Sequence, residues 1–240
     1  MAMICIPLKA KDLSSLKKIS SSALKNADLV EVWVDSMPSV PPETIIGMFK
    51  KPLIIVNKGK KEHGAFRGTE KERIVLLGRY AGEGVAYVDV AVDTPKPLLR
   101  ELFARKSRST KVILSYHDFT KTPTLLALKK ARDKAFRAGA HLFKAAVFAR
   151  TYEDNLTILR FLAESRRAGK PCIAHCMGEK GRISRILAPL FGSYIIYAAP
   201  EVRRAGRNHA EGARASIRHA TAPGQLTVSE YKKFFSLLKL

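Results

Sequence analysis

Cysteine, side-chain amides and long apolar runs are all scarce in this sequence. No run of about 18 or more apolar residues occurs, so a helix that spans a membrane is not expected. The three cysteines are Cys5, Cys172 and Cys176. An odd number without an export signal at the start of the chain favours reduced thiols and a cytoplasmic location. One glutamine and four asparagines indicate adaptation to heat, because side-chain amides are thermolabile.

Negative charge is scarce as well. The chain has 21 acidic residues against 43 lysines and arginines, which gives a net charge of +22. A charge of this size attracts polyanions or an anionic substrate, or it reflects only a highly charged surface. The basic residues are spread along the chain without an RNA- or DNA-binding motif, so a nucleic-acid partner is not expected.

Two kinds of binding signature are missing or weak. No glycine-rich phosphate loop follows any apolar run, which argues against a nucleotide-binding doubly wound fold. Cys172, His175 and Cys176 lie close together, but no second pair of metal-binding residues accompanies them. A metal site is therefore not expected.

The order of apolar segments predicts the fold. Eight short β-branched runs alternate with eight amphipathic segments, which fits a single (β/α)8 TIM barrel over residues 1–240 better than an open sheet. The expected strands are residues 3–7, 29–34, 52–57, 86–92, 111–116, 141–147, 171–176 and 194–198. The expected helices are residues 12–26, 41–50, 69–82, 95–108, 124–138, 152–168, 182–191 and 227–239.

In such a barrel, chemistry collects at the C-terminal ends of the strands. His117 and Lys144 lie on two neighbouring expected strands, so they should meet over one pocket. The apolar sequence neighbours of Lys144 predict a desolvated, neutral amine, the form that attacks carbonyls. Histidine is suited to proton transfer near neutral pH. The pair predicts a Schiff-base lysine with a histidine partner, and Glu31 is expected as a buried carboxylate nearby.

Two loops near the chain end carry further candidates. Arg185 falls in the first turn of the expected helix 182–191, where it could hold a carboxylate or could lie exposed. An arginine-rich loop at about residues 200–220 is expected to be a lid or a solvated insertion. It ends in Thr221-Ala222-Pro223-Gly224-Gln225, a turn that could present Thr221 and Gln225.

Several of these motifs together resemble a known family. They are Ser115-Tyr116-His117-Asp118-Phe119 followed by Lys121-Thr122-Pro123, then Lys144, Ile183-Ser184-Arg185, Phe191-Gly192-Ser193 and Ala222-Pro223-Gly224-Gln225. Their order and spacing resemble the type I 3-dehydroquinate dehydratases over essentially the whole chain. The resemblance implies a (β/α)8-barrel hydro-lyase of the shikimate pathway of aromatic amino-acid biosynthesis. It would convert 3-dehydroquinate to 3-dehydroshikimate and water without metal or cofactor, as a homodimer.

The resemblance also implies roles for individual residues. Lys144 would form an imine with the substrate ketone, His117 would move the proton and Glu62 would orient His117. Glu31 would hold substrate hydroxyls. The substrate carboxylate would be bound by Arg185 and Gln225, with Thr221 in place of the family serine.

The sequence departs from the family at other positions. Trp33 and Lys58 stand at binding positions where the family has arginine, and Cys5 stands where a serine is common. The N-terminal hairpin of some relatives is not expected here, because the first expected strand starts near Met1. Two alternatives remain open: another Schiff-base barrel, such as an aldolase on a phosphorylated sugar, and a basic nucleic-acid-binding protein on an inactive barrel.

Overall fold

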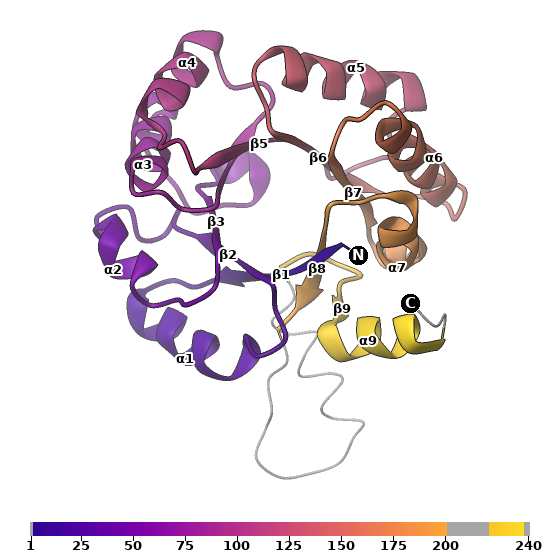
Figure 1. The fold of residues 1–240 in the computed structure, drawn as a ribbon, viewed down its shortest axis with the longest axis horizontal. Helices are drawn as coiled ribbons and strands as arrows, with labels where there is room; N and C mark the ends of the chain where they lie inside the picture. The colour runs from indigo at the N-terminus through magenta and orange to yellow at the C-terminus, as the bar shows by residue number, and fades with distance from the viewer. Residues whose placement is uncertain (1, 201–220, 238–240) are drawn as a thin grey trace.

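The computed structural model describes residues 2–200 and 221–237, which form a ring of parallel strands surrounded by helices (Figure 1). The strands are β1 (Met3–Lys9), β2 (Leu29–Trp33), β3 (Leu53–Val56), β4 (Tyr87–Ala91), β5 (Lys111–Asp118), β6 (Leu142–Phe148), β7 (Cys172–Met177), β8 (Ile195–Ala199) and β9 (Leu226–Thr227). The α-helices are α1 (Leu13–Ala23), α2 (Pro42–Ile46), α3 (Glu70–Gly82), α4 (Lys96–Arg105), α5 (Leu125–Arg137), α6 (Asp154–Arg167), α7 (Arg182–Phe191) and α9 (Val228–Leu237). Two short 3-10 helices are η1 (Lys60–Glu62) and η2 (Glu179–Gly181).

The strand order confirms the predicted (β/α)8 barrel. Neighbours in the sheet run β7-β6-β5-β4-β3-β2-β1-β8-β9, and every pair is parallel. The ring closes between β7 and β8 through a single bridge, where the Tyr194 amide donates to the Cys172 carbonyl at 2.8 Å. The short strand β9 was not expected from the sequence, because two residues carry no measurable periodicity.

Local chemistry explains why the helices begin where they do. Thr69 caps α3 in a capping box with Glu72, and Thr124 caps α5 through the Ala127 amide. Pro42 lies at the start of α2, where its fixed backbone angle suits the first helical turn. These signals are local, which is why the helix positions could be predicted from sequence.

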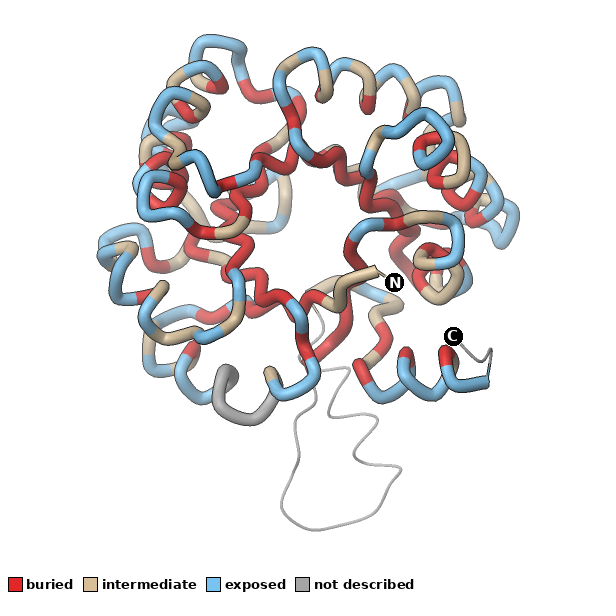
Figure 2. The backbone as a smooth tube through the Cα atoms, in the orientation of Figure 1, coloured by how far each residue is buried: buried red, intermediate tan, exposed pale blue. Residues whose placement is uncertain are grey.

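Burial follows the layers of the barrel. The strands are buried along most of their length, and the helices bury only the faces turned toward them (Figure 2). Strands covered on both faces are typical of parallel sheets. The strand residues that point outward join the helices in the larger apolar core, and those that point inward form a smaller core that includes Cys5, Ile113 and Tyr197.

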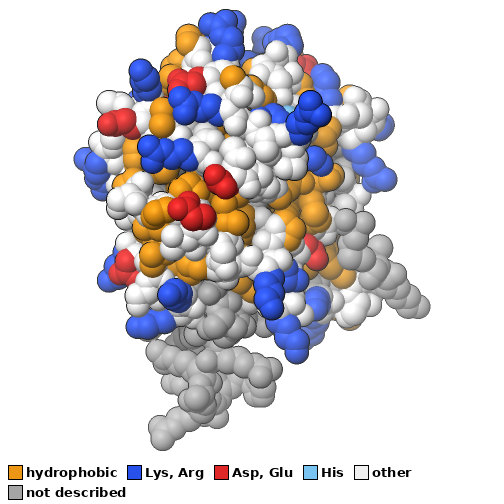
Figure 3. All heavy atoms as spheres, turned by 60° about the vertical axis from the view of Figure 1, so that its left-hand side comes forward, with side chains coloured by type: hydrophobic (Ala, Val, Ile, Leu, Met, Phe, Trp, Pro, Cys, Tyr) orange, Lys and Arg blue, Asp and Glu red, His pale blue; other side chains and the backbone are white. Residues whose placement is uncertain are grey.

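The surface shows where the excess positive charge lies. Lys and Arg side chains are scattered over the face drawn in Figure 3, with fewer acidic side chains among them. In the described ranges, no helix is long and apolar enough to cross a membrane. An arginine-rich loop was expected at about residues 200–220. Residues 201–220 of it lie outside the described residues.

Candidate active site

A cavity of about 400 Å³ opens at the C-terminal ends of the strands. This is the end of a (β/α)8 barrel where functional residues gather. All nine site residues expected from the sequence line it: Glu31, Trp33, Lys58, Glu62, His117, Lys144, Arg185, Thr221 and Gln225. The structure therefore brings together residues that span almost two hundred positions of the chain.

The pairing of β5 with β6 shows how the lysine and the histidine lie in the cavity wall: they come from neighbouring strands, and the histidine is two residues closer to the C-terminal end. Lys144 on β6 is paired with Ser115 on β5, and His117 is paired with Ala146. Side chains alternate along a strand, so Lys144 points into the barrel while Phe143 and Ala145 point into the outer core. The apolar sequence neighbours of Lys144 therefore do not surround its amine.

The expectation of a neutral Lys144 was wrong for this state of the site. Lys144 Nζ lies 3.2 Å from Glu31 Oε2 and 3.1 Å from Asp89 Oδ2, and all three side chains are buried. Burial alone would lower the pKa of Lys144, but the charges of Asp89 and Glu31 outweigh it and hold the pKa well above its ordinary value. Lys144 is therefore an ammonium ion before substrate arrives.

Asp89 is a central residue of the site that the sequence reasoning missed. It is 0 % exposed and bonds Lys144 through Oδ2 and Lys58 through Oδ1, the latter at 2.9 Å. The Ser115 hydroxyl donates to the same Oδ1 at 2.7 Å. The signal was present in the sequence, since Asp89 interrupts an apolar strand just as Glu31 does.

On the other side of Asp89, Lys58 connects it to the histidine. Lys58 is 2 % exposed, and its Nζ also lies 2.9 Å from Glu62 Oε1. Glu62 Oε1 in turn lies 3.0 Å from His117 Nδ1. Burial would raise the pKa of Glu62, but Lys58 and His117 lower it to about 2, so Glu62 is a carboxylate. Lys58 is thus engaged by two carboxylates, whereas the resemblance implied contact with substrate.

The protonation of His117 follows from the same neighbours. Burial and then the positive charge of Lys58 lower the pKa of His117, while its hydrogen bond to Glu62 acts in the opposite direction. The net shift is downward, so the imidazole is neutral at neutral pH and can act as a base. Because Nδ1 faces the Glu62 carboxylate, Nδ1 carries the proton and Nε2 is left free to accept one.

A glycine makes this arrangement possible. Glu62 is the last residue of η1, which follows β3 in the chain, and Gly64 comes two residues later. A Cβ at Gly64 would lie 1.8 Å from the Lys58 carbonyl oxygen, closer than any side chain allows. The loop can therefore pack Glu62 against Lys58 only with glycine at this position.

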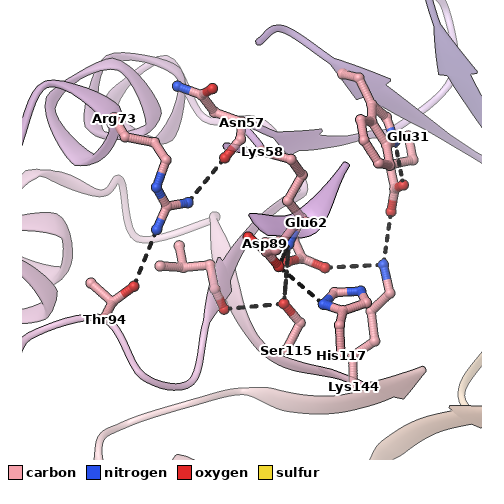
Figure 4. A network of polar contacts seen from close by, with 12 residues as sticks. Glu31, Asn57, Lys58, Glu62, Arg73, Asp89, Thr94, Ser115, His117 and Lys144 are labelled. Carbon is pink, nitrogen blue, oxygen red and sulfur yellow. Dashed lines mark hydrogen bonds and ion pairs between the residues drawn. The ribbon is translucent and has the colours of Figure 1, made fainter. Parts of the chain in front are cut away.

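Taken together, these contacts form a continuous line through the barrel, in which charge alternates from Glu31 to Glu62 and which ends at the neutral His117 (Figure 4). The line runs through Glu31, Lys144, Asp89, Lys58, Glu62 and His117. It couples the candidate nucleophile electrostatically to the candidate base, because each cation lies between two anions.

A different set of residues forms a positive end of the cavity. Arg185 is 2 % exposed, and its Nη2 donates to the Pro223 carbonyl at 3.3 Å. Its Nε has no hydrogen-bond partner among the described residues, and burial lowers its pKa to about 10. Gln225 Oε1 accepts from the Thr221 amide at 2.9 Å, which holds the turn beside the arginine. A buried guanidinium that lines the cavity is suited to bind a carboxylate.

Trp33 is the last residue of β2, and its contact with Glu31 was not expected from the sequence. Its Nε1 donates to Glu31 Oε1 at 2.9 Å, and Lys9 Nζ lies 4.7 Å from the centre of its ring. Glu31 is therefore held between Trp33 and Lys144. The indole fixes the carboxylate that contacts the lysine.

Two further residues of the cavity wall were not expected. His175 on β7 is paired with Ala146, so it lies across β6 from His117, and Tyr197 on β8 packs against it at a ring-centre distance of 6.0 Å. Burial and the charge of Arg185 hold the pKa of His175 well below its ordinary value. Within residues 2–200 and 221–237, no group of three or more His, Cys, Asp or Glu side chains could hold a metal ion.

The parallel barrel, with charged side chains gathered in a cavity at the C-terminal ends of its strands, is typical of enzymes of the (β/α)8-barrel class. The family model described as type I 3-dehydroquinase matches residues 4–240, and the chain belongs to this family. A 3-dehydroquinate dehydratase from Methanococcus maripaludis is 35% identical over 238 residues, 99% of this chain and 100% of the relative.

Solved structures share the fold. The type I 3-dehydroquinate dehydratase from Clostridium difficile superposes with a TM-score of 0.82 at 24% identity, covering 99% of this chain and 92% of that one. The 3-dehydroquinate dehydratase from Aquifex aeolicus superposes with a TM-score of 0.74 at 26% identity and covers 98% of both chains. The predicted resemblance and the predicted fold are both confirmed.

Proposed function

We propose that this chain dehydrates 3-dehydroquinate to 3-dehydroshikimate as a step of the shikimate pathway, and that it does so through an imine at Lys144. Membership of the type I 3-dehydroquinase family supports the reaction. The observation that carries the mechanism is a buried lysine on β6 beside a histidine on the neighbouring strand β5, whose ring contacts the Glu62 carboxylate of η1. A lysine imine is an electron sink, so the carbon beside it becomes acidic enough for a histidine to deprotonate.

The first step is activation of the amine. Lys144 rests as an ammonium ion and must lose a proton before it can attack the ketone. Asp89 is a poor acceptor: burial would raise its pKa, but Lys144 and Lys58 hold that pKa below its usual range. Glu31, the other carboxylate in contact with Nζ, is the acceptor in this mechanism. The amine then adds to the C3 carbonyl carbon, Glu31 returns its proton to the carbinolamine oxygen, and water leaves to give the protonated imine.

The second step is proton transfer at C2. His117 Nε2 takes the C2 proton, and the electron pair of the C–H bond moves toward the iminium nitrogen to give an enamine. The same proton is then returned to the C1 hydroxyl as the C1–O bond breaks, so water leaves and the ring becomes a conjugated iminium. Addition of water and release of the amine free 3-dehydroshikimate. Glu62 keeps His117 in the tautomer that this step needs.

Substrate recognition falls to the two ends of the cavity. Arg185 and Gln225, with the Thr221 hydroxyl, bind the substrate carboxylate, because Arg185 is a buried cation that lines the cavity. Glu31, held by Trp33, is placed to accept from a substrate hydroxyl once the imine has formed. Lys58 also lines the cavity, and its amine is held by Glu62 and Asp89.

The remaining properties follow from the family and the sequence. The chemistry needs no metal and no cofactor, because the imine supplies the electron sink. We also propose a single-domain chain that works in the cytoplasm and pairs with a second copy as a homodimer.

Appearance of the conjugated enone in the ultraviolet tests this function directly. Purified protein with 3-dehydroquinate should give a rising absorbance, and Lys144→Ala should give none while keeping the far-ultraviolet circular dichroism of the wild type. Lys144→Arg should be equally inactive, because a guanidinium stays protonated and cannot add to a ketone. Full activity in either variant would remove Lys144 from the mechanism.

A further inference from the structure

Tyr197 contacts the nitrogen on which the proposed reaction takes place. It lies on β8, is 4 % exposed and is paired through the backbone with Cys5 on β1. Lys144 Nζ lies 4.3 Å from the centre of the Tyr197 ring. His175 packs against the same ring, so the tyrosine cannot swing away from the lysine without repacking the wall.

The number of N–H groups on this nitrogen changes during the reaction. The resting ammonium has three N–H bonds and donates to both Glu31 and Asp89. A protonated imine has only one N–H bond, so it can donate fully to only one of these carboxylates. The positive charge persists while one of its hydrogen bonds is lost. A contact between the cation and the face of an aromatic ring needs no N–H, and it therefore survives this change.

We propose that the ring of Tyr197 stabilises the protonated imine of Lys144 through a cation–π contact, which makes Tyr197 a further catalytic residue. This inference rests on the proposed function, because it assigns a role in the imine that Lys144 forms. The contact is strengthened by burial, since an aromatic ring attracts a desolvated cation more than a hydrated one.

The phenol hydroxyl is not required for this role. Burial and the negative charge of Glu31 hold the pKa of Tyr197 well above its ordinary value, so the ring carries no negative charge. Its hydroxyl oxygen makes no well-formed hydrogen bond among the described residues, although it lies close enough to Lys144 to contribute to the raised pKa of the lysine. The ring face is then the part of the side chain that acts on the cation, and a phenylalanine should replace it.

Two substitutions separate the ring from the hydroxyl. Tyr197→Phe keeps the ring, and Tyr197→Leu removes it while keeping an apolar side chain. Tyr80→Leu is the matched control, because Tyr80 on α3 is also buried, also has a hydroxyl without a partner among the described residues, and does not line the cavity. It reports what the loss of any buried tyrosine does to the fold.

The first readout is the fraction of protein trapped by limiting borohydride during turnover of 3-dehydroquinate. Tyr197→Leu should lower kcat and the trapped fraction, by less than the roughly thirtyfold of a fully desolvated cation–π contact, because the resting ammonium loses part of the same contact. Tyr197→Phe and Tyr80→Leu should stay close to wild type. Equal losses in Tyr197→Phe and Tyr197→Leu would assign the effect to the hydroxyl and overturn the proposal, as would the absence of a loss in both.

The second readout needs no substrate. Competitive acetylation of Lys144 at alkaline pH, followed by mass spectrometry, measures how much neutral amine is present. Tyr197→Leu should raise the acetylated fraction because the ammonium loses a stabilising contact, and Tyr197→Phe should not. A wild-type protein that gives no adduct with 3-dehydroquinate would overturn the proposed function. The acetylation comparison would still decide the contact, and unchanged acetylation in Tyr197→Leu would overturn it.

Discussion

Asp89 Oδ2 lies 3.1 Å from Lys144 Nζ in the interior of the barrel. The carboxylate also holds Lys58, so a single buried anion serves two buried cations. Its loss would leave each buried lysine with one carboxylate in place of two, and weakening buried pairs is far more costly than the loss of a surface pair. Asp89 should therefore affect both the stability of the fold and the charge of the amine.

Asp89→Asn should lower the free energy of unfolding by about 3–5 kcal/mol, the range for breaking a buried pair. Chemical denaturation monitored by circular dichroism measures this change. Asp133→Asn is the matched control, because Asp133 pairs with Arg132 and Lys170 while about a third of its side chain is exposed. Its loss should be about 1 kcal/mol or less. Equal effects of the two substitutions would show that Asp89 does not hold the interior charges together.

The pH dependence of kcat/KM should report His117. The pKa of this histidine lies below its ordinary value, so activity should fall only at pH below that ordinary value, as Nε2 becomes protonated. Lys58 lowers this pKa and the hydrogen bond to Glu62 raises it. Lys58→Met should therefore move the acid limb to higher pH, and Glu62→Gln should move it to lower pH with a reduced plateau.

If the acid limb of kcat/KM moved in the same direction in Lys58→Met and Glu62→Gln, Lys58 and Glu62 would not act on His117 with opposite sign. His175 should add no limb near neutral pH, because burial and the charge of Arg185 keep its pKa far below that range. His175→Gln should therefore leave the position of the acid limb unchanged.

His117→Ala should slow turnover by about 10²–10⁴, the factor that general acid–base catalysis supplies. Lys144 remains able to form the imine in this variant, so the covalent intermediate should accumulate. Intact-protein mass spectrometry after borohydride reduction measures it. Normal turnover in His117→Ala would mean that another group moves the proton.

Arg185→Ala should raise KM for 3-dehydroquinate by a factor that corresponds to about 1.5–3 kcal/mol, as for a hydrogen bond to a charged group. Steady-state kinetics measures it. Arg182→Ala is the matched control, because Arg182 is in the same helix but half-exposed and 3.7 Å from Glu179 and from Glu230. If the control raised KM as much as Arg185→Ala, general positive charge and not a specific contact would be responsible.

The sequence was most informative where side chains act within one strand or one helix. The strand pattern placed Lys144, His117 and Glu31 at the same end of the barrel, and helix spacing placed Arg185 near the start of α7. The ends of parallel strands must lie together, so these positions follow from topology. All of them line the cavity.

The side chains around Lys144 could not be predicted from the pattern of its own strand. Its charged neighbours Glu31 and Asp89 come from β2 and β4, and they meet the lysine only because the ring of strands closes. A pattern along β6 contains no information about residues across the barrel. The expectation of an apolar environment failed for this reason, and the Tyr197 contact from β8 was missed for the same one.

The central claim is that Lys144 forms the covalent intermediate. Peptide mapping by mass spectrometry of the protein reduced with borohydride in the presence of 3-dehydroquinate tests it most directly. The account predicts one adduct, on the peptide that contains Lys144, and no adduct in Lys144→Ala. Lys58→Met, which removes the neighbouring buried amine, should keep the adduct on Lys144. An adduct on Lys58, or turnover in wild type with no adduct at all, would contradict the account.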